Sequence, residues 1–354
     1  MGRVSSHFLT PATPGTAASL TPAGRASLLA DGELRLPGPR LPGLPGGSWI
    51  AASLHAPAAG VAPSGALLVC SPGGTYSRAC ADLSVPGRSG YSMAAHFTAR
   101  GHYVLAVDTL GTGSSAAPPN GDLVTMDIAA RALADASAAA RKLLTEAGAG
   151  RITVIGLGHS LGGAITVATQ ALAEPFAAVA VLGYSPSWRS VPSAGRPETS
   201  AATLRPAVLA ELTAADPALW SSSYVCFGRE ATRAFSHWPD VPADVVLAAD
   251  GDQVAVPRGL ATDFGMTGPA RQAAARVRVP LFLGFGERDV TDRPHDEPGY
   301  YPASRDVTLR VLAGSGHCQY TASSRQQLWN RLDQWMTTVI RSREDTHGQP
   351  AGQP

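Results

Sequence analysis

A serine flanked by glycines is the residue of this chain with the clearest chemical potential. In Gly158-His159-Ser160-Leu161-Gly162, a glycine stands two positions before the serine and another two positions after it. Glycines at these positions allow a sharp turn that lifts the serine hydroxyl away from the backbone. On such a turn, the N–H of Leu161 at the start of the next helix can stabilise a developing oxyanion. We therefore predict that Ser160 is the nucleophile of an acyl-transfer reaction.

A histidine near the end of the sequence has the placement expected of the matching base. A serine hydroxyl is a weak nucleophile without an adjacent base, and an imidazole titrates near neutral pH. His317 follows the apolar run 307–312 through a short turn of Ala, Gly and Ser. We predict that His317 is this base, and that the neighbouring His159 contacts the substrate instead.

The elements that must position these residues are short apolar strands alternating with helices. We expect strands at 48–55, 66–70, 103–107, 151–156, 177–182, 280–285 and 307–312, and helices at 90–100, 123–147, 161–172 and 324–340. This alternation predicts an α/β fold, with a mostly parallel central sheet covered by helices on both faces. Such sheets bind ligands at the carboxyl ends of their strands, where both Ser160 and His317 fall.

The alternation of strands and helices is interrupted once, at residues 186–276. We therefore predict a division of the chain into five segments. We expect a flexible arm at 1–30, a core at 31–185 and 277–340, a helical cap at 186–276, and a disordered tail at 341–354. An unstructured loop as long as 186–276 is uncommon, so helices are expected there. Its aromatic residues either line an apolar substrate pocket or form the core of the cap itself: Trp188, Trp220, Tyr224 and Trp238.

Five segments together resemble the α/β-hydrolase superfamily over about residues 50–340. In the order of that family they are SPGGTY at 71–76, DTLGTGSS at 108–115, GHSLGG at 158–163, GERD at 286–289 and GSGHC at 314–318. The resemblance implies a Ser-His-Asp triad of Ser160, His317 and Asp289, in which the acid holds the histidine tautomer. Asp292 and Glu287 remain alternatives for the acid, and Asp108 is expected to serve structure.

The loop that would complete the oxyanion hole departs from the usual His-Gly pattern of the family. It reads Ser71-Pro72-Gly73-Gly74-Thr75-Tyr76, and its glycines still allow a main-chain N–H to face the substrate. We expect Gly74 to donate together with Leu161, with Gly73 and Thr75 as alternatives. The side chains of Thr75 and Tyr76 either contact the substrate or pack.

A serine at this turn, rather than an aspartate, favours acyl transfer over epoxide or haloalkane hydrolysis. We expect cleavage of a carboxylic ester of a small or medium apolar molecule. The alternative is a biosynthetic thioesterase, acyltransferase, C–C hydrolase or acyl-eliminating lyase of secondary metabolism. The least favoured interpretation is a non-catalytic binding protein, because a receptor would not need all three triad residues.

The composition of the chain indicates which kinds of binding partner to expect. The formal net charge is +1 and no basic run is interleaved with aromatic residues, so we expect no binding of nucleic acid. No apolar stretch is long enough to span a membrane, and no targeting segment is visible. The four cysteines lack C-x-x-C spacing, so we expect free thiols, a cytoplasmic location, and no metal or cofactor. The oligomeric state is left open.

Overall fold

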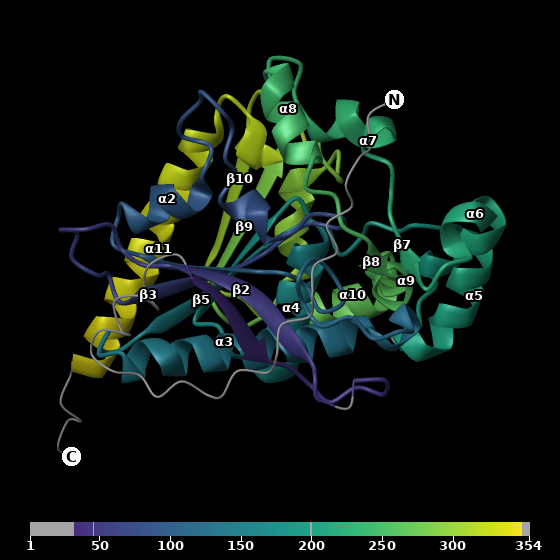
Figure 1. The fold of residues 1–354 in the computed structure, drawn as a ribbon, viewed down its shortest axis with the longest axis horizontal. Coiled ribbons are helices and arrows are strands. Elements are labelled where there is room, and N and C mark those ends of the chain that lie inside the picture. The colour runs from purple at the N-terminus through teal and green to yellow at the C-terminus, as the bar shows by residue number, and fades with distance from the viewer. Residues whose placement is uncertain (1–31, 45, 199, 349–354) are drawn as a thin grey trace, which may run out of the picture.

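The computed structural model describes residues 32–44, 46–198 and 200–348, and its centre is one eight-stranded sheet (Figure 1). The order is β1-β2-β4-β3-β5-β6-β9-β10, in which β2 runs antiparallel to its neighbours and the other pairs are parallel. The strands are β1 (Gly32–Pro37), β2 (Trp49–His55), β3 (Ala66–Ser71), β4 (Tyr103–Val107), β5 (Thr153–His159), β6 (Ala178–Leu182), β9 (Leu281–Gly286) and β10 (Val307–Leu312). The expected fold class is confirmed.

Helices cover both faces of this sheet (Figure 1). One face carries α2 (Met93–Thr98) and α11 (Arg325–Gly348), and the other carries α3 (Met126–Glu146) and α4 (Leu161–Ala173). Successive residues of a strand point to opposite faces, so Leu67 and Leu68 belong to different hydrophobic clusters. Because both faces are covered, β3, β4, β6 and β9 are buried along their whole length, as their uninterrupted apolar sequences predict.

The segment between β6 and β9 is mainly helical, and we call residues 183–280 the β6–β9 insertion. It contains α5 (Ala201–Ala215), α6 (Pro217–Trp220), α7 (Arg229–Ser236), α8 (Ala243–Asp250), α9 (Arg258–Phe264) and α10 (Thr267–Ala274), with a ribbon of β7 (Tyr224–Val225) and β8 (Val256–Pro257). The last helix, α10, packs against α4 and so joins the layer that covers the sheet. The boundaries 186–276 of a separate cap stay a prediction.

Two features at the ends of the chain differ from expectation. Strand β1 was not predicted, although Leu34 and Leu36 alternate with Glu33 and Arg35 in the pattern of a half-buried strand. The prediction of a disordered tail from residue 341 is wrong up to Gly348, because α11 continues that far. Extending an existing helix through Arg and Glu residues costs little free energy. The arm at 1–30 and residues 349–354 lie outside the described residues.

Two further expectations concerned disulfide bonds and membrane-spanning helices. All four cysteines are among the described residues and none forms a disulfide, as expected. Within residues 32–348 as described, no helix has the length and apolar character needed to cross a membrane.

Candidate active site

Ser160 occupies a strained turn between β5 and α4. Its backbone angles are φ 52° and ψ −118°, a region that residues with a side chain rarely adopt. The flanking glycines are required by close packing, because a Cβ on Gly158 would lie 2.1 Å from the carbonyl oxygen of Gly162. A Cβ on Gly162 would lie 2.2 Å from the carbonyl oxygen of Ser71. The Ser160 hydroxyl does not cap α4 and instead lines a cavity.

His317 and Asp289 form a close pair in the same region. His317 Nδ1 lies 2.6 Å from Asp289 Oδ1, and the Asp289 side chain is fully buried. With Nδ1–H donating to the carboxylate, Nε2 is left to accept a proton. Of the three acids considered for this position, Asp289 is the one that reaches His317, whereas Glu287 accepts from the Gly314 N–H.

The topology explains why residues so distant in sequence meet. Strands β5, β9 and β10 are all parallel, so the loops that carry Ser160, Asp289 and His317 leave the same edge of the sheet. The sheet order reverses direction between β3 and β5, which is where crevices form in open α/β sheets. The loop after β3 therefore lies beside Ser160.

That loop provides the neighbours of Ser160 that were expected for an oxyanion hole. A Cβ on Gly73 would lie 3.5 Å from Ser160 Cβ, and one on Gly74 would lie 3.6 Å from Leu161 Cδ2. Leu161 is the first residue of α4, where backbone N–H groups lack helical partners. The structure thus brings Gly73, Gly74 and Leu161 together around the serine.

Thr75 and Tyr76 link the same loop to the β6–β9 insertion. Thr75 has φ 63°, and its carbonyl oxygen accepts from the Val254 N–H at 3.1 Å and from Arg229 Nη2. The Tyr76 hydroxyl lies 3.3 Å from Cys318 Sγ. Both Thr75 and Tyr76 also line the cavity, so their sites allow substrate contact as well as packing.

His159 is a neutral structural partner of His317. Its Nε2 lies 2.8 Å from the carbonyl oxygen of His317, and the two rings are 4.7 Å apart. Burial, together with the neighbouring His317, lowers the pKa of His159 to about 3. A neutral imidazole in this position donates from Nε2 and holds the loop that carries His317.

Gln319 was missed by sequence reasoning. Its Nε2 donates to Asp289 Oδ2 at 2.8 Å, and the Gly286 N–H donates to the same oxygen at 2.8 Å. The one sequence signal was its place two residues after His317, on the loop expected to face the acid. Both carboxylate oxygens of Asp289 are thus held in place.

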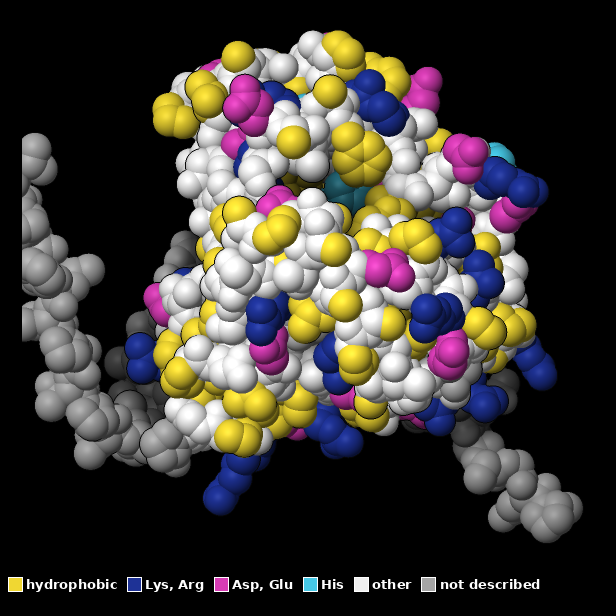
Figure 2. Space-filling model, turned by 90° about the vertical axis from the view of Figure 1, so that its right-hand side faces the viewer, with side chains coloured by type: hydrophobic (Ala, Val, Ile, Leu, Met, Phe, Trp, Pro, Cys, Tyr) yellow, Lys and Arg dark blue, Asp and Glu magenta, His cyan; other side chains and the backbone are white. Residues whose placement is uncertain are grey.

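The cavity that contains Ser160 and His317 has a volume of about 390 Å³ and a largely apolar wall. Figure 2 shows a hollow on the face that carries α5 and α6, with hydrophobic side chains around it and a histidine visible inside. Besides the residues already named, its wall consists of Trp188, Ser190, Leu212, Trp220, Phe227, Thr232, Phe235, Ser236, Val256, Ala261 and Phe264. Trp188 and Trp220 therefore lie on the cavity wall, and their contact with a substrate stays a prediction.

Tyr224 and Trp238 lie elsewhere. The Tyr224 hydroxyl donates to the carbonyl oxygen of Pro118 at 2.6 Å, and Tyr224 does not line the cavity. Strand pairing between β7 and β8 holds Tyr224 in that position, so the structure does not support its predicted role in substrate binding. Trp238 lies under the guanidinium group of Arg288 instead.

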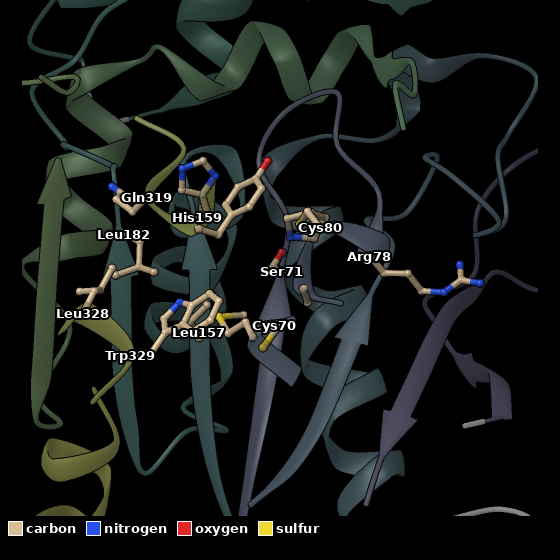
Figure 3. Close-up of a pocket in the computed structure, with 14 residues that line it drawn as sticks. Cys70, Ser71, Arg78, Cys80, Leu157, His159, Leu182, Gln319, Leu328 and Trp329 are labelled. Atoms are coloured by element: carbon tan, nitrogen blue, oxygen red, sulfur yellow. The ribbon is translucent and has the colours of Figure 1, made fainter. Parts of the chain in front are cut away.

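His159 also lines a second, much smaller cavity (Figure 3). Its volume is about 30 Å³, and residues of β3, β5 and α11 line it, including Cys70, Leu157 and Trp329. That is room for little more than a water molecule. Of the two cavities that His159 lines, the larger is therefore the one with room for a substrate.

Asp108 has a structural position, as expected. It is buried and accepts from the N–H groups of Arg78 at 2.7 Å and Ser114 at 2.9 Å, and from Arg78 Nη1. A Cβ on Gly113 would lie 2.4 Å from its carboxylate. Asp108 does not line the cavity that contains Ser160.

Solved structures that share the fold include esterases, a lipase and a proline iminopeptidase. A thermophilic esterase from Thermogutta terrifontis is 15% identical, with 87% of this chain and 99% of that chain covered and a TM-score of 0.56. A carboxyl esterase from Bacillus coagulans is 16% identical, with 88% and 99% covered and a TM-score of 0.57. A monoglyceride lipase from Saccharomyces cerevisiae is 14% identical, with 88% and 95% covered and a TM-score of 0.57.

At these identities the likeness concerns the fold. A search of curated proteins found no match. A model of the alpha/beta hydrolase family matches residues 67–328, which is most of the chain and includes Ser160, Asp289 and His317. The chain belongs to the alpha/beta hydrolase family.

Proposed function

We propose that this protein is a serine hydrolase that cleaves a carboxylic ester of a small or medium apolar molecule through Ser160, His317 and Asp289. The observation that carries the proposal is the 2.6 Å contact between His317 and Asp289, beside a strained Ser160 in one apolar cavity. The esterases and the lipase that share the fold support the ester as substrate class.

The geometry supports a two-step reaction. Ser160 Oγ attacks the ester carbonyl carbon while His317 Nε2 takes the hydroxyl proton, and Asp289 stabilises the resulting imidazolium. The C–O bond then breaks, His317 protonates the leaving alcohol, and an acyl-enzyme remains. Water, deprotonated by His317, then attacks the acyl carbon. The bond between that carbon and Ser160 Oγ breaks, His317 returns the proton to Oγ, and the carboxylic acid leaves.

The N–H of Leu161 and one from the Gly73–Thr75 segment would stabilise the oxyanion in both steps. Losing one such donor typically costs about 3–4 kcal/mol of transition-state stabilisation. The aromatic wall of the cavity favours an apolar acyl or alcohol group, because burial of apolar surface contributes about 25 cal/mol per Å².

Covalent labelling tests this proposal. A fluorophosphonate should add one covalent mass to the wild-type protein, and Ser160→Ala should abolish the addition. Ser190→Ala is the matched control, because Ser190 lines the same cavity and should leave labelling unchanged. Labelling that survives Ser160→Ala contradicts the proposal. A labelled serine without turnover of any simple ester would favour the biosynthetic acyl-transfer or elimination reactions.

A further inference from the structure

Arg229 places a positive charge at the wall of the apolar cavity. It is the first residue of α7, and only 8% of its surface is exposed. Among the described residues, it is the only Lys, Arg, Asp or Glu that lines the cavity containing Ser160 and His317. No carboxylate of the described protein therefore shares that wall with it.

The guanidinium group is buried without a counter-ion. Among the described residues, Arg229 Nε and Nη1 are buried and have no hydrogen-bond partner, and no acid lies within 4.0 Å of the group. Asp250 and Asp252 are nearby acids whose charges act on Arg229, but both have other partners: Asp250 pairs with Arg233 and His237, and Asp252 accepts from Ser77. Burying an unpaired charge costs several kcal/mol, which a bound anion would offset.

The side chain is also held in position. Its Cζ lies 3.3 Å from the centroid of the Tyr76 ring, and its Nη2 donates to the carbonyl oxygen of Thr75. Thr75 follows Gly73 and Gly74, which lie against Ser160 and Leu161. A charge fixed beside this loop is close to the expected reaction centre.

We propose that Arg229 recognises a carboxylate on the substrate, so that the preferred ester carries one anionic group on an otherwise apolar body. A half-ester of a dicarboxylic acid has this chemistry: its ester carbonyl meets Ser160 and its free carboxylate pairs with Arg229. Arginine suits a carboxylate because its planar fork of N–H donors matches the two oxygens. The kinetic test of this inference rests on the proposed ester hydrolysis, whereas a test by ligand binding does not.

The other role open to Arg229 is to hold Thr75, and thereby the oxyanion loop, in its strained conformation. The two roles differ in one measurable respect. A residue that acts only through Thr75 would affect charged and neutral esters equally, because both need the oxyanion hole. A carboxylate partner affects only the charged ester.

The kinetic experiment compares monoethyl with diethyl esters of the same diacids, from succinate to suberate, by acid release at constant pH. For wild type, we expect a higher kcat/KM for the best monoester than for its diester. Arg229→Met should lower kcat/KM for the monoester roughly 10- to 100-fold more than it lowers kcat/KM for the diester. Arg229→Lys should keep part of the preference, because it keeps the charge without the fork.

Arg233→Met is the matched control, since Arg233 lies one turn further along α7, is exposed, and does not line the cavity. It should leave both esters unaffected. Equal losses on both esters in Arg229→Met, or a wild type without preference for the monoester, overturn the proposal. Arg229→Lys provides the same comparison if Arg229→Met does not fold.

The binding experiment does not depend on reaction at Ser160. Monoethyl and diethyl adipate are titrated calorimetrically into Ser160→Ala, with and without Arg229→Lys or Arg229→Met. The monoester should bind more tightly than the diester. Arg229→Met should remove that difference, and Arg229→Lys should reduce it. If the fluorophosphonate does not label Ser160 but the monoester still binds more tightly than the diester, only the hydrolase proposal is rejected. If Ser160 is labelled but the two esters bind equally well, only the role of Arg229 is rejected.

Discussion

Gln319 Nε2 lies 2.8 Å from Asp289 Oδ2, on the opposite side of the carboxylate from the oxygen that meets His317. The amide and the Gly286 N–H both donate to Oδ2, while the Val290 N–H donates to Oδ1 at 2.8 Å. Three donors besides His317 therefore hold this buried carboxylate in its orientation.

Asp289→Asn should lower kcat by about 10⁴-fold, since an amide stabilises the wrong histidine tautomer. The rate of fluorophosphonate labelling should fall as well, while the melting temperature should change less than activity does. Asp292→Asn is the control, because Asp292 is exposed and does not bond to His317. An Asp289→Asn enzyme with nearly wild-type turnover would move the acid to another residue.

Gln319→Leu should lower kcat roughly tenfold and leave KM nearly unchanged, because it removes one donor from Asp289 without altering the substrate cavity. Gln319→Glu should be worse, since it places a second carboxyl group beside the first. The exposed Gln327→Leu serves as control. If kcat is unchanged in both Gln319 variants, the contact does not position the acid.

Gly162→Ala should destabilise the protein by about 3 kcal/mol or more, because its Cβ would overlap the Ser71 carbonyl oxygen in a closely packed turn. Chemical denaturation of the two proteins measures the difference. Gly299→Ala is a matched control, since nothing lies within 4 Å of a Cβ there. A stable Gly162→Ala variant would contradict the packing argument for the second glycine of the motif.

Asp108→Asn should reduce stability by about 3–5 kcal/mol, because it leaves the half-buried Arg78 without its closest counter-ion. The folded fraction should still label at Ser160 at the wild-type rate, since Asp108 lies outside the cavity. Asp82→Asn, at an exposed neighbouring acid, should change neither property. Loss of labelling in fully folded Asp108→Asn would assign Asp108 a part in the reaction.

The free energy of unfolding should fall as rising pH removes the proton from the Glu297 carboxyl group. Burial raises the pKa of Glu297 from 4.5 to about 7, although the hydroxyls of Ser185 and Thr291 act in the opposite direction. The folded state therefore binds this proton more tightly than the unfolded state, and stability falls between about pH 4.5 and pH 7.

Glu297→Gln should consequently exceed wild type in stability by about 2–3 kcal/mol at pH 8, with the difference vanishing near pH 4. Unfolding measured by denaturant at several pH values tests this expectation. Asp306→Asn is the control, because Asp306 is exposed and is not among the groups that shift the pKa of Glu297. A difference independent of pH would mean that Glu297 is already ionised, or that the amide acts through packing.

Much of the fold and the centre of the candidate site could be predicted from the sequence, because these features are local. Uninterrupted apolar runs such as 103–107 form strands wherever both faces are covered, and the glycines around Ser160 shape a turn that needs no distant partner. His317 follows the last predicted strand, so a parallel sheet places it at the same edge as Ser160.

The tertiary structure decided what depends on distant contacts. Asp289 rather than Glu287 meets His317, because loop geometry at the ends of β9 and β10 directs one carboxylate inward and the other towards Gly314. Trp220 lines the cavity while Tyr224 is turned away by strand pairing. No local pattern could have shown that Arg229 is buried beside Tyr76 with no ion-pair partner in the part of the chain that the structure describes, since that follows from how α7 packs on the loop after β3. Sequence spacing thus singled out Ser160 as the candidate nucleophile. Long-range packing determined which acid meets His317 and the character of the cavity around the serine.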